Sequence, residues 1–535
     1  MEESAVKRQG KSITRGLAWL VLAAAFALSV GFYARCGAHN LTADDSSEMV
    51  MAAQLNEEGK LLSENWLYST ELRVISPTPA YQLGLRLFGS WHAARTFAVA
   101  VVGLLVIASC LFMMRQLGLW QAAPWFAAVL ALPFSNAYAY IVLYGCYYAV
   151  HVALSFVMVG LAARYARRGL AKGALSLLAL AALGFVSGLG GVRMLTMLIA
   201  PLAAASALLG VWALRDSERL TDAAHTPYTR MAAAAWTAAL TGAAGYAVNM
   251  LVLAGKYRYH TYSGLQLGAF ELEDFLHQVS GVVRDLGYRA NEAFFSLGGV
   301  ASFVTLGLCL LLAFAALRLL ARWRETPPAV RLLLTTALVA IALGMALNVL
   351  LGQILTRYFI VGTLLLVAAL FAWLQTEACR CHGLRTLAMA AVVCCFAFQA
   401  QCVMRYDYTL GKVNYEMAAD WLLERGYTQG YATFWNANTL TEASDGQIEM
   451  WVLEDGRRDL WMNLELHDIL QSREHYTRDP EGKVFLLVTE EEDKTIAPLL
   501  DKAHIIGENI AWSYTIYGYD SVEEMRSLIA SGAQP

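Results

Sequence analysis

Apolar runs separated by short polar connections make up the first three quarters of the chain. The first run is Leu17–Tyr33, and ten more lie near 93–114, 117–134, 137–163, 173–191, 194–214, 231–254, 296–317, 332–352, 359–376 and 385–404. Each has about the 20 residues that an α-helix needs to cross a bilayer. The pattern predicts an α-helical polytopic membrane protein with about eleven transmembrane helices. Pro124 and Pro133 are expected to bend or break the helices over 117–163.

Lysine and arginine residues in the short connections indicate which way the helices run. With a cytoplasmic N-terminus, the connections on the cytoplasmic side contain Arg115, Arg164, Arg167, Arg168, Lys172, Arg215, Arg219, Arg230, Arg318, Arg322, Arg324, Arg331, Arg380 and Arg385. This bias obeys the positive-inside rule. It places the loops 35–91 and 255–294 and everything after Arg405 on the outer side. We therefore expect a multi-pass protein of the cell membrane.

The chain becomes hydrophilic near its end, which divides it into a membrane part, 1–405, and a soluble part, 406–535. The amphipathic segment Lys412–Arg425 predicts a helix, and Ser521 and Glu524 have capping-box spacing for the last helix. Segments rich in aromatic and β-branched residues predict strands at 430–435, 448–453, 483–488 and 512–517. We expect a small α/β extracytoplasmic domain, whose sequence contains no catalytic motif, phosphate-binding loop or metal-ligand spacing.

Composition narrows the class of protein. Of the 535 residues, 58% are hydrophobic and 16% are charged, and the formal net charge is −3. Because there is no basic excess, no nucleic acid partner is expected. None of the nine cysteines follows Tyr406, which argues against a disulfide framework in the soluble part. The Cys379-Arg380-Cys381-His382 run has zinc-binding residue types, but no second ligand pair lies at a suitable spacing.

An acidic cluster, Asp44, Asp45 and Glu48, directly follows the first apolar run. In a helix that begins here, Asp44 and Glu48 lie on one face, and negative charge favours the helix N-terminus. Carboxylates beside an apolar slab are costly unless they are solvated or paired, which makes them candidates for function. The alternative is structural: Asp44 or Asp45 caps the helix and has no further role.

Two arginines lie at the expected outer ends of apolar runs. Arg193 belongs to a glycine-rich segment, 188–194, where small residues leave room for a ligand. Arg357 is followed by Tyr358 in a very short outer loop. A guanidinium in either place can pair with one of the acids or hold a phosphate through two parallel hydrogen bonds. The alternative is that each arginine extends to the lipid headgroup layer, as is common near helix ends.

The second outer loop alternates basic and aromatic residues just beyond an apolar run: Lys256, Tyr257, Arg258, Tyr259, His260 and Tyr262. Tyrosines at this depth commonly form an interfacial aromatic belt. As a set, these residues also suit a lipid headgroup or a sugar ring. The acids within 271–274 give a weak indication of a metal site, so a divalent metal is the one candidate cofactor, with no ligands assigned.

The order of features over 39–81 is distinctive. Asp44 and Asp45 come first, then Ala52-Ala53-Gln54-Leu55, then Pro77, Pro79 and Tyr81. In this order the loop resembles that of the integral-membrane GT-C glycosyltransferases, in particular the aminoarabinose transferases and protein O-mannosyltransferases, although the family usually carries Asp-Glu where this chain has Asp44-Asp45. Arg357-Tyr358 looks like the Arg-Tyr pair before a late span in many bacterial members. The resemblance covers roughly residues 15–405.

The resemblance implies transfer of a sugar from a polyprenyl-phosphate donor to an acceptor at the outer face of the membrane. The acceptor is a glycan, a lipid or a protein, and membrane lipids surround the site. A carboxylate that removes the acceptor's proton makes its hydroxyl a useful nucleophile, and we assign this role to Asp44. Asp45 and Glu48 are expected to position the acceptor or a metal. A single displacement would invert the anomeric centre.

The remaining candidate residues are expected to bind the substrates. Fixed cations stabilise the charge that develops on a departing phosphate, and we assign this role to Arg193 and Arg357, with Tyr358 beside them. The loops around the substrates are expected to contribute Arg73, Tyr81, Tyr257, Arg258 and His260.

Three other functions stay open at the level of the sequence. A transporter or flippase of a lipid-linked glycan is also polytopic, but many show paired similar halves, and none is visible here. A polymerase or ligase of lipid-linked glycans shares the outer arginines, yet it gives no special reason for acids directly after the first run. In the third, the soluble part performs the function and the membrane part is not catalytic.

Overall fold

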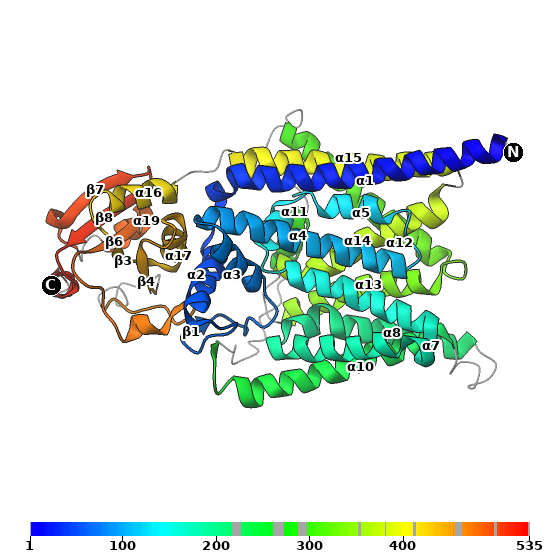
Figure 1. Ribbon diagram of the computed structural model, residues 1–535, viewed down its shortest axis with the longest axis horizontal. Coiled ribbons are helices and arrows are strands. Elements are labelled where there is room, and N and C mark those ends of the chain that lie inside the picture. The colour runs from blue at the N-terminus through cyan, green and yellow to red at the C-terminus, as the bar shows by residue number, and fades with distance from the viewer. Residues whose placement is uncertain are drawn as a thin grey trace.

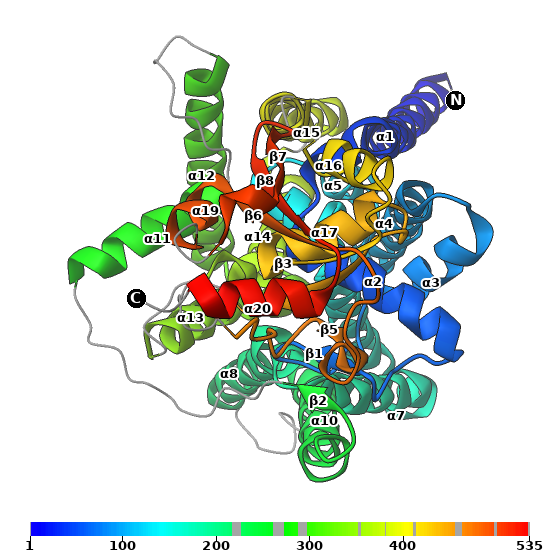
Figure 2. The same ribbon diagram turned by 90° about the vertical axis from the view of Figure 1, so that its left-hand side faces the viewer.

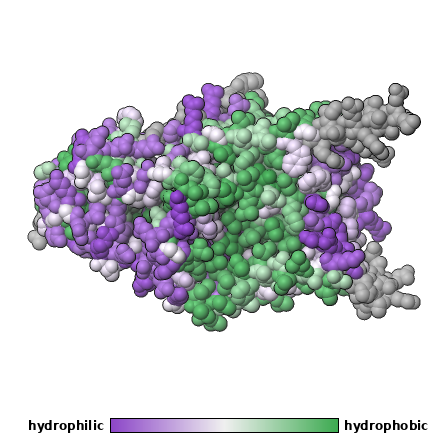
Figure 3. Space-filling model, viewed as in Figure 1, coloured by the Kyte–Doolittle hydropathy of each residue, from purple (hydrophilic) through white to green (hydrophobic). Residues whose placement is uncertain are grey.

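The computed structural model in Figure 1 shows a bundle of long helices with a small α/β unit at one end. The structure describes residues 2–216, 226–259, 272–286, 297–350, 355–379, 381–409, 414–454, 463–496 and 500–532. The N-terminus lies at the end of the bundle opposite the C-terminal unit (Figure 1). On the face shown in Figure 3, hydrophobic side chains form a broad band between two polar ends, as expected for a protein that crosses a bilayer.

Nine helices in the described part of the chain are long and apolar enough to cross a membrane. They contain α1 (Glu2–Cys36), α4 (Trp91–Gln116), α7 (Ala149–Gly190), α8 (Ala200–Asp216), α10 (Pro227–Val248), α12 (Leu297–Ala321), α13 (Pro328–Leu350), α14 (Ile360–Trp373) and α15 (His382–Val403). Short 3₁₀ or π segments extend them: η3 (Leu195–Ile199), η4 (Asn249–Leu253), η5 (Thr356–Phe359), η6 (Leu374–Ala378) and η7 (Met404–Thr409). The predicted class, an α-helical polytopic membrane protein, is confirmed.

Helix α7 is a hairpin with two arms. At Gly169 the backbone leaves the helical region with φ +64°, a value that glycine adopts without strain. Tyr148 precedes the first arm, and its ring centroid lies 4.7 Å from the guanidinium carbon of Arg193, which follows the second arm. Because the two ends of α7 meet, the chain turns back at Gly169, where the sequence predicts a short connection.

The segment before α7 is a broken crossing. Helix α5 (Ala123–Leu130) has Pro124 in its first turn, where the missing N–H is tolerated. Pro133 lies in the break, after which the chain resumes as α6 (Asn136–Tyr138) and the π-helix η2 (Ala139–Leu143). The second arm of α7 adds one crossing to the nine, and this segment adds another. The described chain therefore comes close to the eleven crossings expected, although one expected helix is divided between η2 and α7.

The loop after α1 builds the surface that faces the C-terminal unit. Its elements are the 3₁₀ turn η1 (Gly37–Asn40), α2 (Ala43–Glu58), β1 (Trp66–Tyr68) and α3 (Thr78–Leu87). Strand β1 pairs in parallel with β2 (Arg258–Tyr259) and antiparallel with β5 (Gln471–Ser472). A separate helix in the second outer loop is α11 (Leu272–Leu286). Three segments far apart in the sequence therefore share the β2-β1-β5 sheet.

The C-terminal unit is a five-stranded sheet in the order β4-β3-β6-β8-β7. Its strands are β3 (Gln429–Thr433), β4 (Glu449–Leu453), β6 (Val484–Thr489), β7 (Ile505–Ile510) and β8 (Tyr514–Tyr519), and its helices include α16 (Asn414–Leu423), α17 (Phe434–Ala443), α19 (Glu490–Ile496) and α20 (Val522–Gly532). β4, β3 and β6 are parallel, whereas β8 is antiparallel to both neighbours. The four predicted strands are confirmed. β7 was not predicted because Gly507 and Asn509 interrupt its apolar pattern.

The C-terminal unit packs on the outer loop. Ala43 of α2 shares a hydrophobic cluster with Ala437 and Leu440 of α17, and Figure 2 shows α17 in front of α2. The backbone N–H of Trp91, at the start of α4, donates a hydrogen bond of 2.6 Å to the carboxylate of Asp445. The helix that carries the acidic cluster is therefore held between the membrane bundle and the C-terminal unit.

Candidate active site

The acidic cluster lies in the first turns of α2, and Thr42 is the cap of this helix. The Thr42 hydroxyl oxygen accepts the backbone N–H of Asp45 at 3.3 Å and donates to Oδ2 of Asp45 at 2.8 Å. The alternative in which Asp44 or Asp45 is itself the N-cap is therefore wrong. Both carboxylates still lie beside the positive end of the α2 dipole.

Asp44 and Asp45 differ in their surroundings. Asp44 is half-buried and accepts a hydrogen bond of 3.3 Å from the Tyr140 hydroxyl. Asp45 is 5% exposed, and its Oδ1 has no hydrogen-bond partner among the described residues. Burial raises the pKa of Asp45 to about 7, although the positive charge of Arg95 acts in the opposite direction. Asp44 is thus the accessible carboxylate of the pair.

Gly145 and Tyr81 support the backbone beside Asp45. A Cβ at Gly145 would lie 2.6 Å from Oδ1 of Asp45 and closer still to the Tyr140 carbonyl, so this close approach requires glycine. The buried Tyr81 hydroxyl donates to the carbonyl of Gly145 at 3.3 Å and accepts from Arg95 at 3.4 Å. Tyr81, a predicted substrate-loop residue, lies beneath the acidic cluster rather than on an open surface.

Glu48 is engaged within the protein. Its side chain is 1% exposed and forms an ion pair of 2.8 Å with Arg73. Oε2 of Glu48 also accepts a hydrogen bond of 3.3 Å from the Thr78 hydroxyl. The structure thus places Glu48 and Arg73 together, where they tie α2 to the loop before α3.

Arg193 pairs with a carboxylate other than the three considered from the sequence. Nε of Arg193 lies 3.2 Å from Oε1 of Glu71, which also accepts the backbone N–H of Arg193 at 3.2 Å. Burial raises the pKa of Glu71, and Arg193 opposes this shift. The guanidinium also lies over the Tyr148 ring. Arg193 is therefore fixed by an acid on one side and a ring on the other, and it does not extend to the headgroup layer.

Arg357 and Tyr358 lie in η5, near the same tyrosine. Burial raises the pKa of Tyr148 to about 12, and Arg193 and Arg357 are the charges that oppose this rise. The guanidinium carbon of Arg357 is 5.5 Å from the Tyr358 ring. Within the described residues Arg357 forms no ion pair, and its buried Nε and the buried Tyr148 hydroxyl have no partner. The two arginines that were predicted to act together therefore converge, and donors remain unused beside them.

A row of tyrosines joins the acids to the arginines. Tyr140, which donates to Asp44, has its ring 5.5 Å from Tyr147, and Tyr147 is 5.4 Å from Tyr148. Tyr148 in turn contacts Arg193. Tyr140, Tyr147 and Tyr148, the tyrosine row, therefore link the acidic cluster at one end to Arg193 at the other.

Arg95 and Glu442 form a buried ion pair that sequence reasoning missed. Nε of Arg95 lies 2.5 Å from Oε1 of Glu442, and a terminal nitrogen lies 2.6 Å from Oε2. The same guanidinium donates to the backbone carbonyl of Asp45 at 2.8 Å. Both side chains are at most 3% exposed. The signal was an arginine within an apolar run, which is costly without a partner.

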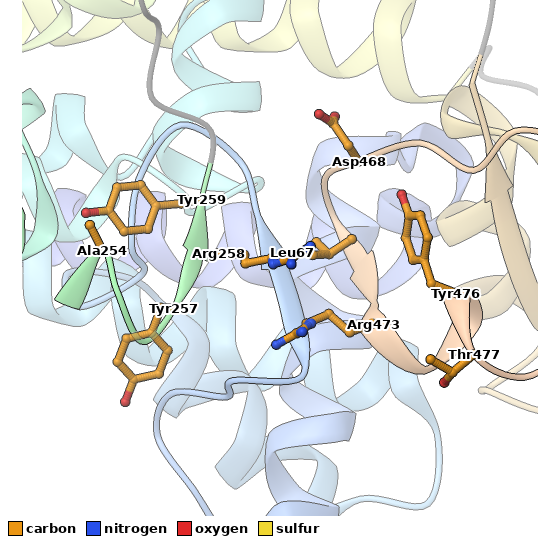
Figure 4. A pocket seen from close by; sticks show the side chains of 9 residues that line it. All are labelled: Leu67, Ala254, Tyr257, Arg258, Tyr259, Asp468, Arg473, Tyr476 and Thr477. Carbon is orange, nitrogen blue, oxygen red and sulfur yellow. The ribbon is translucent and has the colours of Figure 1, made fainter.

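The second outer loop contributes to a different cavity. Tyr257 and Arg258 line a space of about 470 Å³ together with residues that surround β5 (Figure 4). Arg258 belongs to β2, and Tyr257 directly precedes this strand. His260, the other predicted substrate-loop residue of this segment, lies outside the described residues. The loop residues therefore form a surface separate from the tyrosine row.

Two solved structures share the architecture along nearly the whole chain. ArnT from Cupriavidus metallidurans in the apo state has a TM-score of 0.53 at 13% identity, and the same protein bound to undecaprenyl phosphate has 0.54 at 14%. Each comparison covers 97% of this chain and 99% of the other. The chain therefore has the GT-C-like fold that its sequence resembles.

An Archaeoglobus fulgidus oligosaccharyltransferase is a more distant match to this GT-C fold. Its TM-score is 0.47 at 14% identity, over 82% of this chain and 62% of that one. No protein-family model and no curated protein matches the chain.

The residues of the acidic cluster do not present a ready set of metal ligands in this GT-C fold. Glu48 is engaged by Arg73 and Thr78, and Oδ2 of Asp45 by Thr42. Among the described residues, the group of three close enough to hold an ion is Glu454, His467 and Asp468, in the C-terminal unit. Nδ1 of His467 there accepts the backbone N–H of Ile469 at 3.2 Å.

An apolar cavity of about 310 Å³ lies among the helices of the GT-C bundle. It is lined by side chains from α12, α13, α14 and α15, among them Leu308, Ile341, Leu366 and Phe396. Phe359, which also lines it, is the second residue after Arg357. The cavity thus includes a side chain close in sequence to Arg357.

Proposed function

We propose that this protein transfers a sugar from a polyprenyl-phosphate donor to an acceptor at the membrane surface. The observation that carries this proposal is the convergence of Arg193 and Arg357 on Tyr148, with unused buried donors beside them. Buried polar groups in proteins nearly always have hydrogen-bond partners. A bound anion would be such a partner for Nε of Arg357 and for the Tyr148 hydroxyl. A phosphate between them accepts from Arg357 and from the Tyr148 hydroxyl.

The lipid chain of the donor has a suitable place next to this phosphate. Phe359, two residues after Arg357, is one of the side chains that line the apolar cavity among α12 to α15. An isoprenoid chain in this cavity would stay in an apolar environment, with its phosphate at the helix ends. The ArnT structure with undecaprenyl phosphate contains a lipid of this class, which supports the same donor chemistry here.

Asp44 is the residue that we propose as general base. Its half-buried carboxylate is oriented by Tyr140, whereas Asp45 is enclosed and bonded to Thr42. As the acceptor oxygen bonds to the anomeric carbon, its proton moves to Asp44. The bond from that carbon to the phosphate oxygen breaks, and polyprenyl phosphate leaves with the electron pair. One displacement of this kind inverts the anomeric centre.

Purified protein in lipid vesicles, supplied with a radiolabelled polyprenyl-phosphate sugar and an envelope extract as acceptor, tests the proposal. Label is expected to appear in acceptor while free polyprenyl phosphate accumulates. A flippase would instead move intact donor between leaflets without releasing polyprenyl phosphate, and this outcome would contradict the transferase mechanism.

The orientation of the chain is also a proposal. The arginine-rich connections lie at the end of the bundle opposite the C-terminal unit, so residues 406–535 belong on the extracytoplasmic side as a separate domain and the N-terminus belongs in the cytoplasm. A reporter enzyme fused after Arg405, active only outside the cytoplasm, is expected to be active. Activity of a cytoplasmic reporter at the same position would reverse the placement of the site.

Arginine geometry, rather than charge alone, is expected to govern use of the donor. Arg193→Lys and Arg357→Lys keep the positive charge but lose the planar pair of donors. We expect a higher KM for the donor and a lower kcat in both variants, with unchanged melting temperature in detergent. Arg425→Lys, on the exposed side of the C-terminal unit, is the matched control. Parent-like kinetics in both site variants would show that neither arginine binds the phosphate.

A further inference from the structure

The cavity of about 470 Å³ in Figure 4 lies where three parts of the chain meet. Strand β1 comes from the first outer loop, β2 from the second and β5 from the C-terminal unit. We call this space the β1 cavity. Its volume is in the range of small-molecule sites, and its walls are formed by tyrosines, two arginines and an aspartate, Asp468.

The two arginines of the β1 cavity lack carboxylate partners. Among the described residues neither Arg258 nor Arg473 forms an ion pair. Arg473 donates one guanidinium N–H to the backbone carbonyl of Glu64 at 3.1 Å, and Asp468 is the one carboxylate among the residues that line the cavity. By contrast, Arg73, Arg95 and Arg193 each pair with a carboxylate. Two like charges on one cavity wall favour a ligand that carries negative charge.

Strand pairing fixes the backbone at both arginines. Arg258 lies opposite Leu67 in the parallel ladder between β2 and β1. Ser472 lies opposite Trp66 in the antiparallel ladder on the other side, and the backbone N–H of Arg473 donates to the carbonyl of Asn65 at 2.7 Å. Figure 4 shows both guanidinium groups near β1. Because the strands are paired, little ordering is needed when a ligand binds.

Tyrosine rings supply flat surfaces around these charges. Tyr257 and Tyr259 line the side of β2, and Tyr476 lines the side of β5 (Figure 4). The Tyr476 hydroxyl donates to the backbone carbonyl of His467 at 2.8 Å, which restrains its ring. Aromatic side chains with an apolar face and a polar tip suit ligands that have both apolar and polar surfaces. Sugar rings are ligands of this kind. The cavity thus combines features for a sugar with features for an anion.

The β1 cavity is also close to the proposed reaction. Leu67 lines it, and Thr70, three residues later, contacts the guanidinium of Arg193 at 3.5 Å. Three residues span at most about 11 Å of chain. A short oligosaccharide bound in the cavity can therefore extend to Arg193, on the side that faces the C-terminal unit.

We propose that the β1 cavity binds an acidic oligosaccharide, namely the portion of the acceptor that extends beyond the reacting hydroxyl. The assignment of this ligand as acceptor rests on the proposed transferase function, whereas its acidic and saccharide character rests on the cavity alone. Arg258 and Arg473 contact its negative groups, and Tyr257 and Tyr476 pack on its rings. The C-terminal unit thereby takes part in the choice of acceptor.

Binding of defined tetrasaccharides to the purified full chain tests this proposal without turnover. Tetragalacturonate, which is acidic, and maltotetraose, which is neutral, are compared by calorimetry. We expect tetragalacturonate to bind more tightly, and the double variant Arg258→Gln/Arg473→Gln to bind it roughly ten- to hundred-fold more weakly, since hydrogen bonds to charged groups are lost. Arg425→Gln is the control and is expected to bind like the parent.

Three results would overturn the proposal: no binding of either tetrasaccharide, equal binding of both, or parent-like binding by the double variant. The melting temperature of the double variant, expected to match the parent, shows that weaker binding does not reflect unfolding. Binding of tetragalacturonate by a chain that fails to transfer sugar from any polyprenyl-phosphate donor would refute the transferase function and leave the cavity's ligand class intact.

Discussion

Asp44→Asn is expected to lower the rate of sugar transfer by roughly 10²- to 10⁴-fold, the usual contribution of a general base. A neutral amide keeps the size of the side chain and can still contact Tyr140, but it cannot take the acceptor's proton. Because Thr42 rather than Asp44 caps α2, the variant is expected to fold normally. The measurement is transfer from a radiolabelled polyprenyl-phosphate sugar, beside a melting curve in the same detergent.

Neighbouring acids provide the controls for this experiment. Glu57→Gln, on an exposed position of the same helix, is expected to be fully active. Asp45→Asn is expected to be less severe than Asp44→Asn. If Asp45→Asn abolished transfer while Asp44→Asn did not, the base would be Asp45, whose pKa of about 7 suits proton exchange. Unchanged transfer after substitution of Asp44, Asp45 and Glu48 in turn would refute the mechanism.

Glu442→Ala is expected to destabilise the protein by about 3–5 kcal/mol, because it leaves the guanidinium of Arg95 buried without a countercharge. The loss is expected to appear as a lower melting temperature and as protease cleavage of the C-terminal unit. Transfer is also expected to fall, since Arg95 holds the backbone of Asp45 and the hydroxyl of Tyr81.

An exposed ion pair gives the matched comparison. Arg526 and Asp479 lie 2.6 Å apart at nearly half exposure, so Asp479→Ala is expected to cost only about 0–1 kcal/mol. The double variant Arg95→Met/Glu442→Leu removes both buried charges and is expected to melt near the parent temperature. A Glu442→Ala protein that melts and resists protease like the parent would show that the pair does not hold the two parts together.

The number of crossings was predictable because a bilayer imposes a length and an apolar composition on each helix. The reversal at Gly169 lies between the apolar runs 137–163 and 173–191, because each run is long enough for only one crossing. The break near Pro133 was anticipated only in part, because a proline shows that a helix is disturbed and not how the chain continues. The α2 N-terminus was predicted from its acids, although the capping side chain proved to be Thr42.

Side-chain pairing was much less predictable. Pairing of Arg193 with Asp44, Asp45 or Glu48 was one of two possibilities, but the path of the loop brings it to Glu71. Arg95 and Glu442 are separated by 347 positions, and neither position alone indicates the other. Such contacts depend on where loops and domains meet in three dimensions. The periodic spacing of apolar residues determines which face of a helix is buried. It does not specify which side chains the residues near the helix ends contact.

The ion pair between Arg95 and Glu442 has a consequence for the chain during its synthesis. At about 5–20 residues per second of synthesis, the ribosome adds Glu442 roughly 20 to 70 s after Arg95, given their 347-residue separation. Throughout this interval α4 exists with a cation that has not met its partner, and β1 exists without β5. The acidic cluster is synthesised early, but the C-terminal unit that packs on its helix follows much later. If the proposed transfer requires this ion pair, a nascent chain is expected to stay inactive until its C-terminal unit has docked.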